Sequence, residues 1–450
     1  MGYKQCVSRV ELRELVAIAL VAVVIRLALA ASFKGHSYVA TDPVKPEPEA
    51  AYLKRGEIGL GDSEQYLLLG AAIRHRLSYT WNHEPNTFRT PGYPLLLAFL
   101  DNSITAIVIV QAFLAGLTVL LVGLLGGRLF SSRAGLLGAA LLAVDLPSIF
   151  LAGMVMSEVL FSFSVVLAAA LVWGVGSRKP QAASCKPLLA GLVLGFAVLV
   201  RPVALLAFVP FGVALAASRN WRGLGVMLAT FVLLPGVWVA RSYCHYRELS
   251  LTSNGGYNLL YANAAAVMGE EQHTTWDIER LELARDFTAR LATDNPLELA
   301  DAMTRKATSI ILHDPFRYAW ICLRGVPKVI AGIKADDLVL RVIADGGPAT
   351  PRSLLLNPDY GSPGVKVAIF VLAGLELLTT VGTFLLALVS FAFRRRRTEK
   401  LLLVLTGLYF VAVALPFTDG RFRVPAMPFF YLAAATVMVG RPRRGAAEGA

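Results

Sequence analysis

Charged side chains stand beside apolar segments at two neighbouring places in the first hundred residues. Asp62 and Glu64 begin GDSEQYLLLGAAIRHRL, and Arg89 follows in NTFRTPGYPLLLAFL. A carboxylate at a membrane surface can take a proton from an attacking hydroxyl or amine, and the fork of a guanidinium matches phosphate oxygens. The ordinary alternatives are a helix cap for Asp62 and a headgroup anchor for Arg89. Both alternatives stay open at this point.

Other charges lie near the predicted outer ends of apolar segments. Glu158, in MVMSEVLFSF, would be costly facing lipid. It is expected either to pair with an arginine or to line a donor or acceptor pocket. Positive charge at outer ends runs against the usual topological bias, so we predict that the arginines there share an anionic partner such as a phosphate. These arginines are Arg26, Arg201, Arg241, Arg421 and Arg423.

Histidine and cysteine spacing does not indicate a metal centre. The six histidines show neither HxxxH nor HExxH spacing, and the four cysteines form no CxxC pair. No metal site is therefore predicted. Cys244 and Cys322 both fall in predicted outer sequence, which leaves a disulfide between them open.

The composition is typical of a membrane protein. The chain has 450 residues, of which 56% are hydrophobic and 16% charged, with a mean hydropathy of +0.59. A soluble domain carries about 25% charged residues, so we predict an all-α, polytopic integral membrane protein. Spans of about 20 apolar residues are predicted at 14–33, 104–130, 134–152, 155–176, 188–200 with 203–217, 222–243, 365–393, 400–417 and 422–440. These give about 10–12 crossings, the higher number if 92–100 or 318–333 also enters the membrane.

Basic clusters between the spans orient the chain. With a cytoplasmic N-terminus, GRLFSSR, SRKPQAASCK, SRNWR, the arginines at 394–397 and the tail RPRR all lie inside, as the positive-inside rule predicts. Two long segments, 34–103 and 244–364, then face outward. We predict one membrane module over 1–440, containing both outer segments, and a cytoplasmic tail over 441–450.

The outer segments are expected to contain helices. Tyr66, Leu69, Ile73 and Leu77 recur at helical spacing, which predicts an amphipathic helix lying on the membrane surface. The second outer segment is expected to form two or three short helices. Because proline removes an amide donor, the PGYP motif at 91–94 permits a helix only in its first turn.

The order of several motifs is more specific than any one of them. GDSEQYLLLGAAI and FRTPGYPLLLAFL are followed by the apolar stretch 111–161, then by LVRP, PGVWVARSY, TSNGGYNLLYAN and DGRFRVPAMPFFYLAAA. This order resembles the bacterial branch of the GT-C glycosyltransferases, which is similar to protein O-mannosyltransferases and to the lipid A aminoarabinose transferase. The resemblance extends from the first span to about residue 435.

The resemblance implies a lipid-linked donor and a surface-level site. A sugar would move from a polyprenyl phosphate to a protein, lipid or glycan acceptor, with inversion, on the outer side of the inner (plasma) membrane. Asp62 matches the family's general base in position, and Arg89, Arg201, Arg241, Arg421 and Arg423 would bind the donor phosphate. Glu64 and Glu158 are candidates for an acid or an acceptor contact. Pocket roles are implied for Tyr66, Tyr93, Asn254 and Asn258.

Neither a cofactor nor a nucleic-acid partner is expected. Polyprenyl phosphate is already a competent leaving group that arginines can stabilise, although a divalent metal stays open. The chain departs from the eukaryotic mannosyltransferases because Ser63 separates Asp62 from Glu64. A flippase for lipid-linked sugars, or another multi-span transporter, is the alternative. The collection of candidate residues near one membrane face favours the enzyme.

Overall fold

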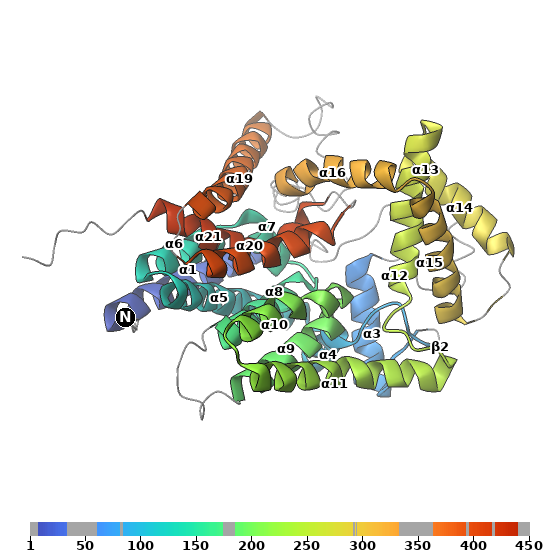
Figure 1. The fold of residues 1–450 in the computed structure, drawn as a ribbon, viewed down its shortest axis with the longest axis horizontal. Coiled ribbons are helices and arrows are strands. Elements are labelled where there is room, and N and C mark those ends of the chain that lie inside the picture. The colour runs from blue at the N-terminus through green and yellow to red at the C-terminus, as the bar shows by residue number, and fades with distance from the viewer. Residues whose placement is uncertain are drawn as a thin grey trace, which may run out of the picture.

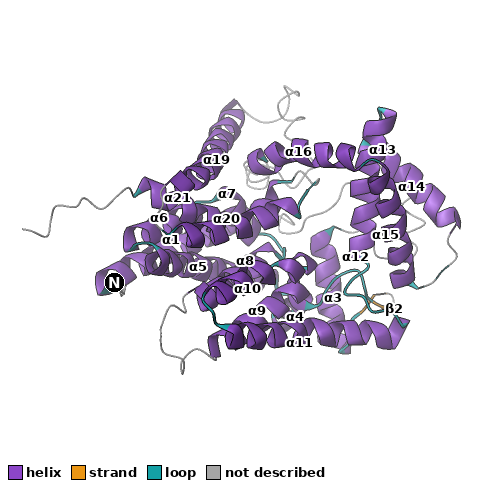
Figure 2. Cartoon of the chain, viewed as in Figure 1, coloured by secondary structure: helices purple, strands orange, loops and turns teal. Residues whose placement is uncertain are grey.

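The computed structural model describes residues 8–33, 61–81, 84–173, 185–290, 293, 295–332, 363–392, 396–415 and 419–439. Within these ranges the chain is overwhelmingly helical, and β structure is confined to one short antiparallel pair (Figure 2). The pair joins β1 (Thr80–Trp81) to β2 (Glu84–Pro85). The predicted all-α fold is confirmed.

Long apolar helices form the body of the molecule. Four of the described helices are long and apolar enough to cross a membrane: α1 (Arg9–Ala31), α5 (Ile104–Leu129), α11 (Trp221–Tyr246) and Lys366–Ala392, which comprises most of α19 (Pro363–Val389) and η4 (Ser390–Ala392). A fifth candidate is the pair α6 (Ser132–Ala143) and α7 (Leu146–Ala152), bent by 57°. The described chain is a multi-pass membrane protein; the total of ten to twelve crossings stays a prediction.

Shorter helices complete the bundle. The predicted break at Arg201–Pro202 is present, because α9 ends at Val200 and the 3₁₀ turn η2 begins at Pro202. The shorter helices are α8 (Glu158–Trp173), α9 (Cys185–Val200), η2 (Pro202–Leu206), α10 (Phe208–Ala217), α20 (Arg397–Ala412), η5 (Gly420–Arg423) and α21 (Met427–Met438).

Small residues let these helices approach closely. A Cβ on Gly126 of α5 would lie 2.8 Å from the Cα of Gly135 on α6, so the two backbones touch there. Close backbone contact between small residues is a usual source of helix association in membranes, where burial of apolar surface supplies little. At the other end of α6, Arg26 of α1 donates to the carbonyl oxygen of Ala143 at 3.1 Å and to Ser148 Oγ of α7 at 3.1 Å.

The first predicted outer segment contributes two helices, α3 (Asp62–Arg76) and α4 (Gly92–Phe99). Tyr66 and Leu69 are buried as the periodic pattern predicts, but Leu77 is 93% exposed. The prediction for Leu77 was wrong because α3 stops one residue earlier, and Leu77 takes the left-handed conformation at its C-cap (φ 51°).

The PGYP motif starts α4 as expected. Pro91 is the N-cap and Pro94 lies in the first turn, where neither needs an amide donor. Gly92 lets α4 meet α9 backbone to backbone. A Cβ there would lie 2.7 Å from both the carbonyl carbon of Leu199 and the amide nitrogen of Val200.

The second predicted outer segment forms a helical layer at the end of the bundle opposite the marked N-terminal end (Figure 1). It contains more helices than the two or three expected, and Leu260, Leu283 and Met303 lie in its separate apolar core. Its elements are α12 (Asn254–Asn258), the π-helical turn η3 (Leu259–Ala264), α13 (Ala265–Gln272), α14 (Trp276–Arg290), α15 (Pro296–His313) and α16 (Pro315–Ala331).

Candidate active site

A cavity of about 770 Å³ lies where the helical layer meets the bundle. Its walls come from α3, the segment before α4, the start of α8, the α9–η2 junction, α12 with η3, α20 and η5. Segments more than three hundred residues apart in sequence therefore share one site. Its charged lining residues are Asp62, Arg89, Glu158, Arg201, Asp419 and Arg421.

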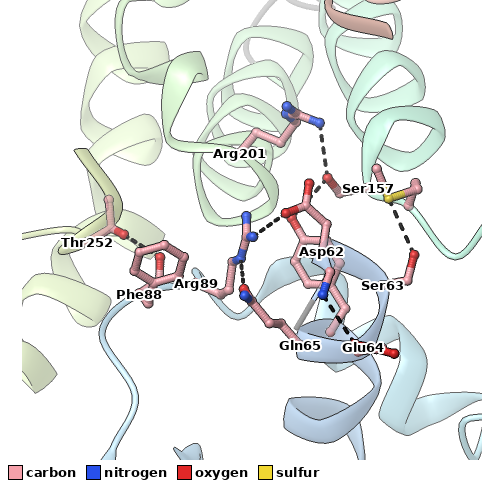
Figure 3. A network of polar contacts seen from close by, with 12 residues as sticks. Asp62, Ser63, Glu64, Gln65, Phe88, Arg89, Ser157, Arg201 and Thr252 are labelled. Atoms are coloured by element: carbon pink, nitrogen blue, oxygen red, sulfur yellow. Dashed lines mark hydrogen bonds and ion pairs between the residues drawn. The ribbon is translucent and has the colours of Figure 1, made fainter. Parts of the chain in front are cut away.

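Asp62 is held between two arginines. Its Oδ1 accepts a hydrogen bond from Arg89 Nη2 (Figure 3), and its Oδ2 accepts one from Arg421 Nη1 at 3.0 Å. The Asp62 side chain keeps 28% of its surface exposed. The carboxylate is thus fixed in orientation and still faces the cavity.

Asp62 is not the cap of its helix, so the ordinary alternative raised by the sequence is wrong. The N-cap of α3 is Gly61, and Glu64 Oε2 accepts the hydrogen bond of the Gly61 amide at 3.2 Å. Among the described residues that line the cavity, Glu64 is absent. Its position accounts for a capping role and gives no support to an acceptor contact.

The Arg89 side chain is positioned on both sides. Its Nε donates to Gln65 Oε1 at 2.7 Å, and its guanidinium carbon lies 5.2 Å from the ring centres of both Tyr66 and Phe88. Gln65 follows Asp62 by three residues and so lies on the same face of α3. Arg89 therefore contacts a carboxylate, an amide and two rings, which is a far more specific setting than a lipid headgroup anchor.

Three positive charges determine the protonation of Asp62. Burial favours the neutral acid, but the charges of Arg89, Arg421 and Arg201 outweigh it and hold the pKa of Asp62 well below its usual range. Asp62 is consequently ionised at every physiological pH. A carboxylate so stabilised is also a weaker base than a free one.

A second ion pair lies beside the first. Arg201 Nη1 lies 2.6 Å from Glu158 Oε1, and the Glu158 side chain is only 1% exposed. The expected pairing of Glu158 with an arginine is present, and Glu158 also contributes to the cavity lining. Ser157 Oγ accepts from Arg201 at 3.3 Å (Figure 3).

The predicted pocket residues differ in their placement. Tyr66, Asn254 and Asn258 line the cavity. Tyr93 is fully buried and, within the described chain, lies outside the lining; its hydroxyl donates to Gln111 Oε1 at 2.7 Å. Its ring packs edge-on against Tyr66 at 4.9 Å. Tyr93 therefore packs behind Tyr66, which lines the cavity, and does not line the cavity itself.

Three of the arginines predicted to share an anion lie elsewhere in the described structure, and the first, Arg26, is held by the Ala143 carbonyl oxygen and Ser148 Oγ. Arg241 donates to the carbonyl oxygens of Asn86 at 3.2 Å and Tyr79 at 3.0 Å, which fixes the strand pair to α11. Arg423 is fully buried and donates to Glu376 Oε1 at 2.5 Å. Only Arg89, Arg201 and Arg421 therefore lie where they could share one anion. The prediction failed for the others because local sequence does not reveal which way an interfacial arginine faces.

Arg423 joins the last part of the chain together. It donates to the carbonyl oxygen of Val329 in α16 at 3.3 Å and to that of Gly332, while its pair with Glu376 reaches α19. A Cβ on the neighbouring Gly420 would lie 2.9 Å from the carbonyl carbon of Gly332, the residue that follows α16, so η5 and the end of α16 touch through backbone.

Sequence reasoning missed several lining residues. Gln65 could have been found from its helical spacing to Asp62, and Asp419 from its place two residues before Arg421. Tyr257 and Tyr318 gave no such local signal, because their approach to the cavity depends on how the outer helices pack.

The described cysteines and potential metal ligands form neither a disulfide nor a cluster that could hold a metal. Cys244 and Cys322 are free thiols, so the disulfide left open does not form. Within the described ranges no cluster of three or more histidine, cysteine, aspartate or glutamate side chains could hold a metal ion. The question of metal dependence stays a prediction from the sequence.

A sequence family matches part of the chain. The PMT family, described as dolichyl-phosphate-mannose-protein mannosyltransferase, matches residues 98–246, about a third of the sequence. The predicted family resemblance is confirmed over this segment. It includes α5, α8, α9 and the residues Glu158, Arg201 and Arg241, and it ends before α12. No curated protein matches the chain.

Solved structures align with this chain at low sequence identity and with TM-scores below 0.5. The oligosaccharyltransferase AglB from Archaeoglobus fulgidus, in complex with an inhibitory peptide and a dolichol-phosphate, is 17% identical with a TM-score of 0.48; the match covers 96% of this chain and 50% of AglB. ArnT from Cupriavidus metallidurans in the apo state is 14% identical with a TM-score of 0.32, covering 94% and 76%. The chain spans about half the length of AglB.

Proposed function

We propose that this protein is a membrane glycosyltransferase that moves a sugar from a polyprenyl phosphate to an acceptor hydroxyl or amine. One observation carries the proposal: Asp62 lies between Arg89 and Arg421 in a large cavity at the end of a membrane bundle. A base beside phosphate ligands is the arrangement that sugar transfer from a lipid phosphate needs. The PMT match over 98–246 supports the same class of reaction.

The proposed reaction is one displacement at the anomeric carbon. The acceptor oxygen or nitrogen attacks that carbon, and its proton passes to an Oδ of Asp62. The bond from the anomeric carbon to the phosphate oxygen breaks, and polyprenyl phosphate leaves with the electron pair. Attack opposite the leaving group inverts the anomeric configuration.

Arg89, Arg201 and Arg421 are assigned to the phosphate. Negative charge on the phosphate grows as the glycosidic bond breaks, and fixed guanidinium groups stabilise that charge more in the transition state than in the bound donor. Arg89 is already oriented by Gln65 and two rings, so little side-chain freedom is lost when it binds.

Donor binding would also change the basicity of Asp62. Both oxygens of this carboxylate accept from arginines. A phosphate that accepts from the same arginines competes with Asp62 and adds negative charge beside it, which raises the pKa of the carboxyl. The base would then be strongest when the donor is in place.

Location and partners follow from the predicted topology. The cavity would open on the extracytoplasmic side of the inner membrane, with both termini in the cytoplasm. The donor's polyprenyl chain would lie in the bilayer. The acceptor would be a protein, a lipid or a glycan of the cell envelope.

Reconstitution tests the proposal against the flippase alternative. Purified protein in liposomes is supplied with polyprenyl-phosphate sugars, and free polyprenyl phosphate and glycosylated product are measured by mass spectrometry. A transferase releases polyprenyl phosphate, whereas a flippase moves the intact donor across the bilayer. Transbilayer movement without release would contradict the proposal. Deleting the gene and finding which polyprenyl-phosphate sugar accumulates would identify the natural donor.

A further inference from the structure

The wall of the cavity formed by the outer helical layer differs in chemistry from the wall around Asp62. We call it the amide wall, and it consists of Thr252, Asn254, Tyr257, Asn258, Asn263 and Tyr318. These six have hydroxyl, amide or phenol side chains, none charged at neutral pH, and Gly255 and Leu259 complete this side of the lining. The wall offers hydrogen bonds and ring faces, which are what a carbohydrate recognises.

Two amides of this wall are open to a ligand. Asn254 and Asn258 are partly exposed and line the cavity, and their side chains make no hydrogen bond within the described ranges. Asn263 differs: its Nδ2 donates to the Asn258 carbonyl oxygen at 3.0 Å, and its Oδ1 accepts from Tyr318 Oη at 2.7 Å. Asn263 and Tyr318 therefore hold the backbone that presents the two open amides.

Aromatic rings join the amide wall to the phosphate arginines. Tyr257 packs edge-on against Phe88 at 5.7 Å and against Tyr261 at 4.8 Å. Phe88 precedes Arg89 in the chain, and in Figure 3 it lies on the side of Arg89 away from Asp62, next to Thr252. A phosphate held by Arg89 would thus have its attached sugar ring within reach of Phe88 and Tyr257.

The charges of the cavity are already balanced. Asp62 pairs with Arg89 and Arg421, Glu158 pairs with Arg201, and Asp419 Oδ2 lies 3.9 Å from Arg421 Nε. The described lining therefore presents three carboxylates and three arginines with no charge left over. Because the amide wall itself contains no charged side chain, neither an ammonium nor a carboxylate on the sugar would find a partner of opposite charge there.

We propose that the amide wall binds the sugar of the donor and selects a neutral, polyhydroxylated sugar over an amino sugar or a uronic acid. Each open amide offers two donors and one acceptor to ring hydroxyls. An ionised substituent against the same wall would lose its hydration without gaining a partner of opposite charge. This inference rests on the proposed function, because it takes a lipid-phosphate donor as given.

Equilibrium binding tests the selection. Full-length protein in nanodiscs is titrated with short-chain polyprenyl phosphate and with its neutral hexoside, amino-sugar glycoside and uronic acid glycoside. The neutral glycoside should bind at least about tenfold more tightly than either charged one, since a burial cost above about 1.4 kcal/mol is a factor of ten. Equal affinities for the three glycosides would overturn the proposal.

Variants connect the selection to named residues. Asn254→Ala and Asn258→Ala should each weaken the neutral glycoside about fivefold, the equivalent of one net hydrogen bond of about 1 kcal/mol. Their affinity for unglycosylated polyprenyl phosphate should not change. Gln272→Ala, an exposed amide outside the cavity lining, is the matched control and should change neither affinity. Equal weakening of both ligands in the asparagine variants would show a structural role and overturn the proposal.

Failure of the inference differs from failure of the proposed function. A protein that binds and turns over amino-sugar donors as well as neutral ones would remain a glycosyltransferase, and only the selection would be wrong. A protein that binds none of the four lipid phosphates would overturn both.

Discussion

Replacing Asp62 by asparagine should separate donor binding from catalysis. Asp62→Asn keeps the shape of the side chain but removes the negative charge that occupies Arg89 and Arg421. Both arginines then become available to the donor phosphate. The variant should therefore bind donor at least as tightly as the wild type while it loses the proton acceptor.

The size of both effects can be estimated. Two unit charges 4 Å apart interact by about 4 kcal/mol at an effective dielectric constant near 20, but exposed pairs contribute about 1 kcal/mol or less. Because the Asp62 side chain is 28% exposed, we expect a gain in donor binding of up to about 1 kcal/mol, or about fivefold. Loss of a general base lowers the transfer rate by about 10²–10⁴-fold.

Single-turnover transfer and donor affinity measure the two quantities separately. Protein in nanodiscs is mixed with radiolabelled donor and excess acceptor, and donor dissociation constants are obtained by competition. Glu64→Gln is the matched control, because it makes the same chemical change two residues away on α3, where Glu64 caps the helix. The control should transfer sugar at close to the wild-type rate. Gel filtration and thermal unfolding establish that both variants are folded.

Three results would refute the reasoning about Asp62. Transfer by Asp62→Asn at the wild-type rate would show that another group accepts the proton. A tenfold loss of donor affinity would show that Asp62 aligns the arginines for the phosphate instead of competing with it. An equal loss of activity in Glu64→Gln would move the catalytic role to Glu64 or to the helix start as a whole.

Three further variants test the site and its support. Arg421→Gln removes one of the charges that lower the pKa of Asp62, so the acid limb of the kcat/KM profile should move to higher pH; an unmoved limb would exclude Asp62 as the titrating group. Arg423→Met should destabilise the protein by about 3–5 kcal/mol because the buried Glu376 loses its arginine, and adding Glu376→Met should restore much of the thermal stability. Gly92→Ala should lower stability and transfer together, since its methyl group would meet the backbone of α9; wild-type values would contradict that contact.

Local sequence predicted the parts of the fold that local physics determines. The apolar spans, the break before Pro202 and the start of α4 depend on composition, helix periodicity and proline chemistry. Asp62 and Arg89 could be expected near each other, because both lie in one predicted outer segment. The structure joins them in an ion pair.

Long-range partners could not be read from the sequence in the same way. Arg421 reaches Asp62 across 359 residues, and nothing in DGRFRVP distinguishes it from Arg423, which faces the opposite way into a buried pair with Glu376. Arg241 was expected at the site for its charge and position, yet two backbone carbonyls hold it. Whether an arginine faces the cavity depends on how the helices pack, because packing decides which side of each turn points toward the cavity.

The contact between Gly92 and α9 sets how the site can move. Gly92 is three residues after Arg89, and the backbone atoms that it touches belong to Leu199 and Val200, directly before Arg201. The main chains that carry Arg89 and Arg201 are thus in van der Waals contact and behave as one rigid unit. Arg421 belongs to the other side, where η5 is tied to α16 and α19. We therefore expect a widening of the site to come from a displacement of η5, while the backbones that carry Arg89 and Arg201 keep their contact.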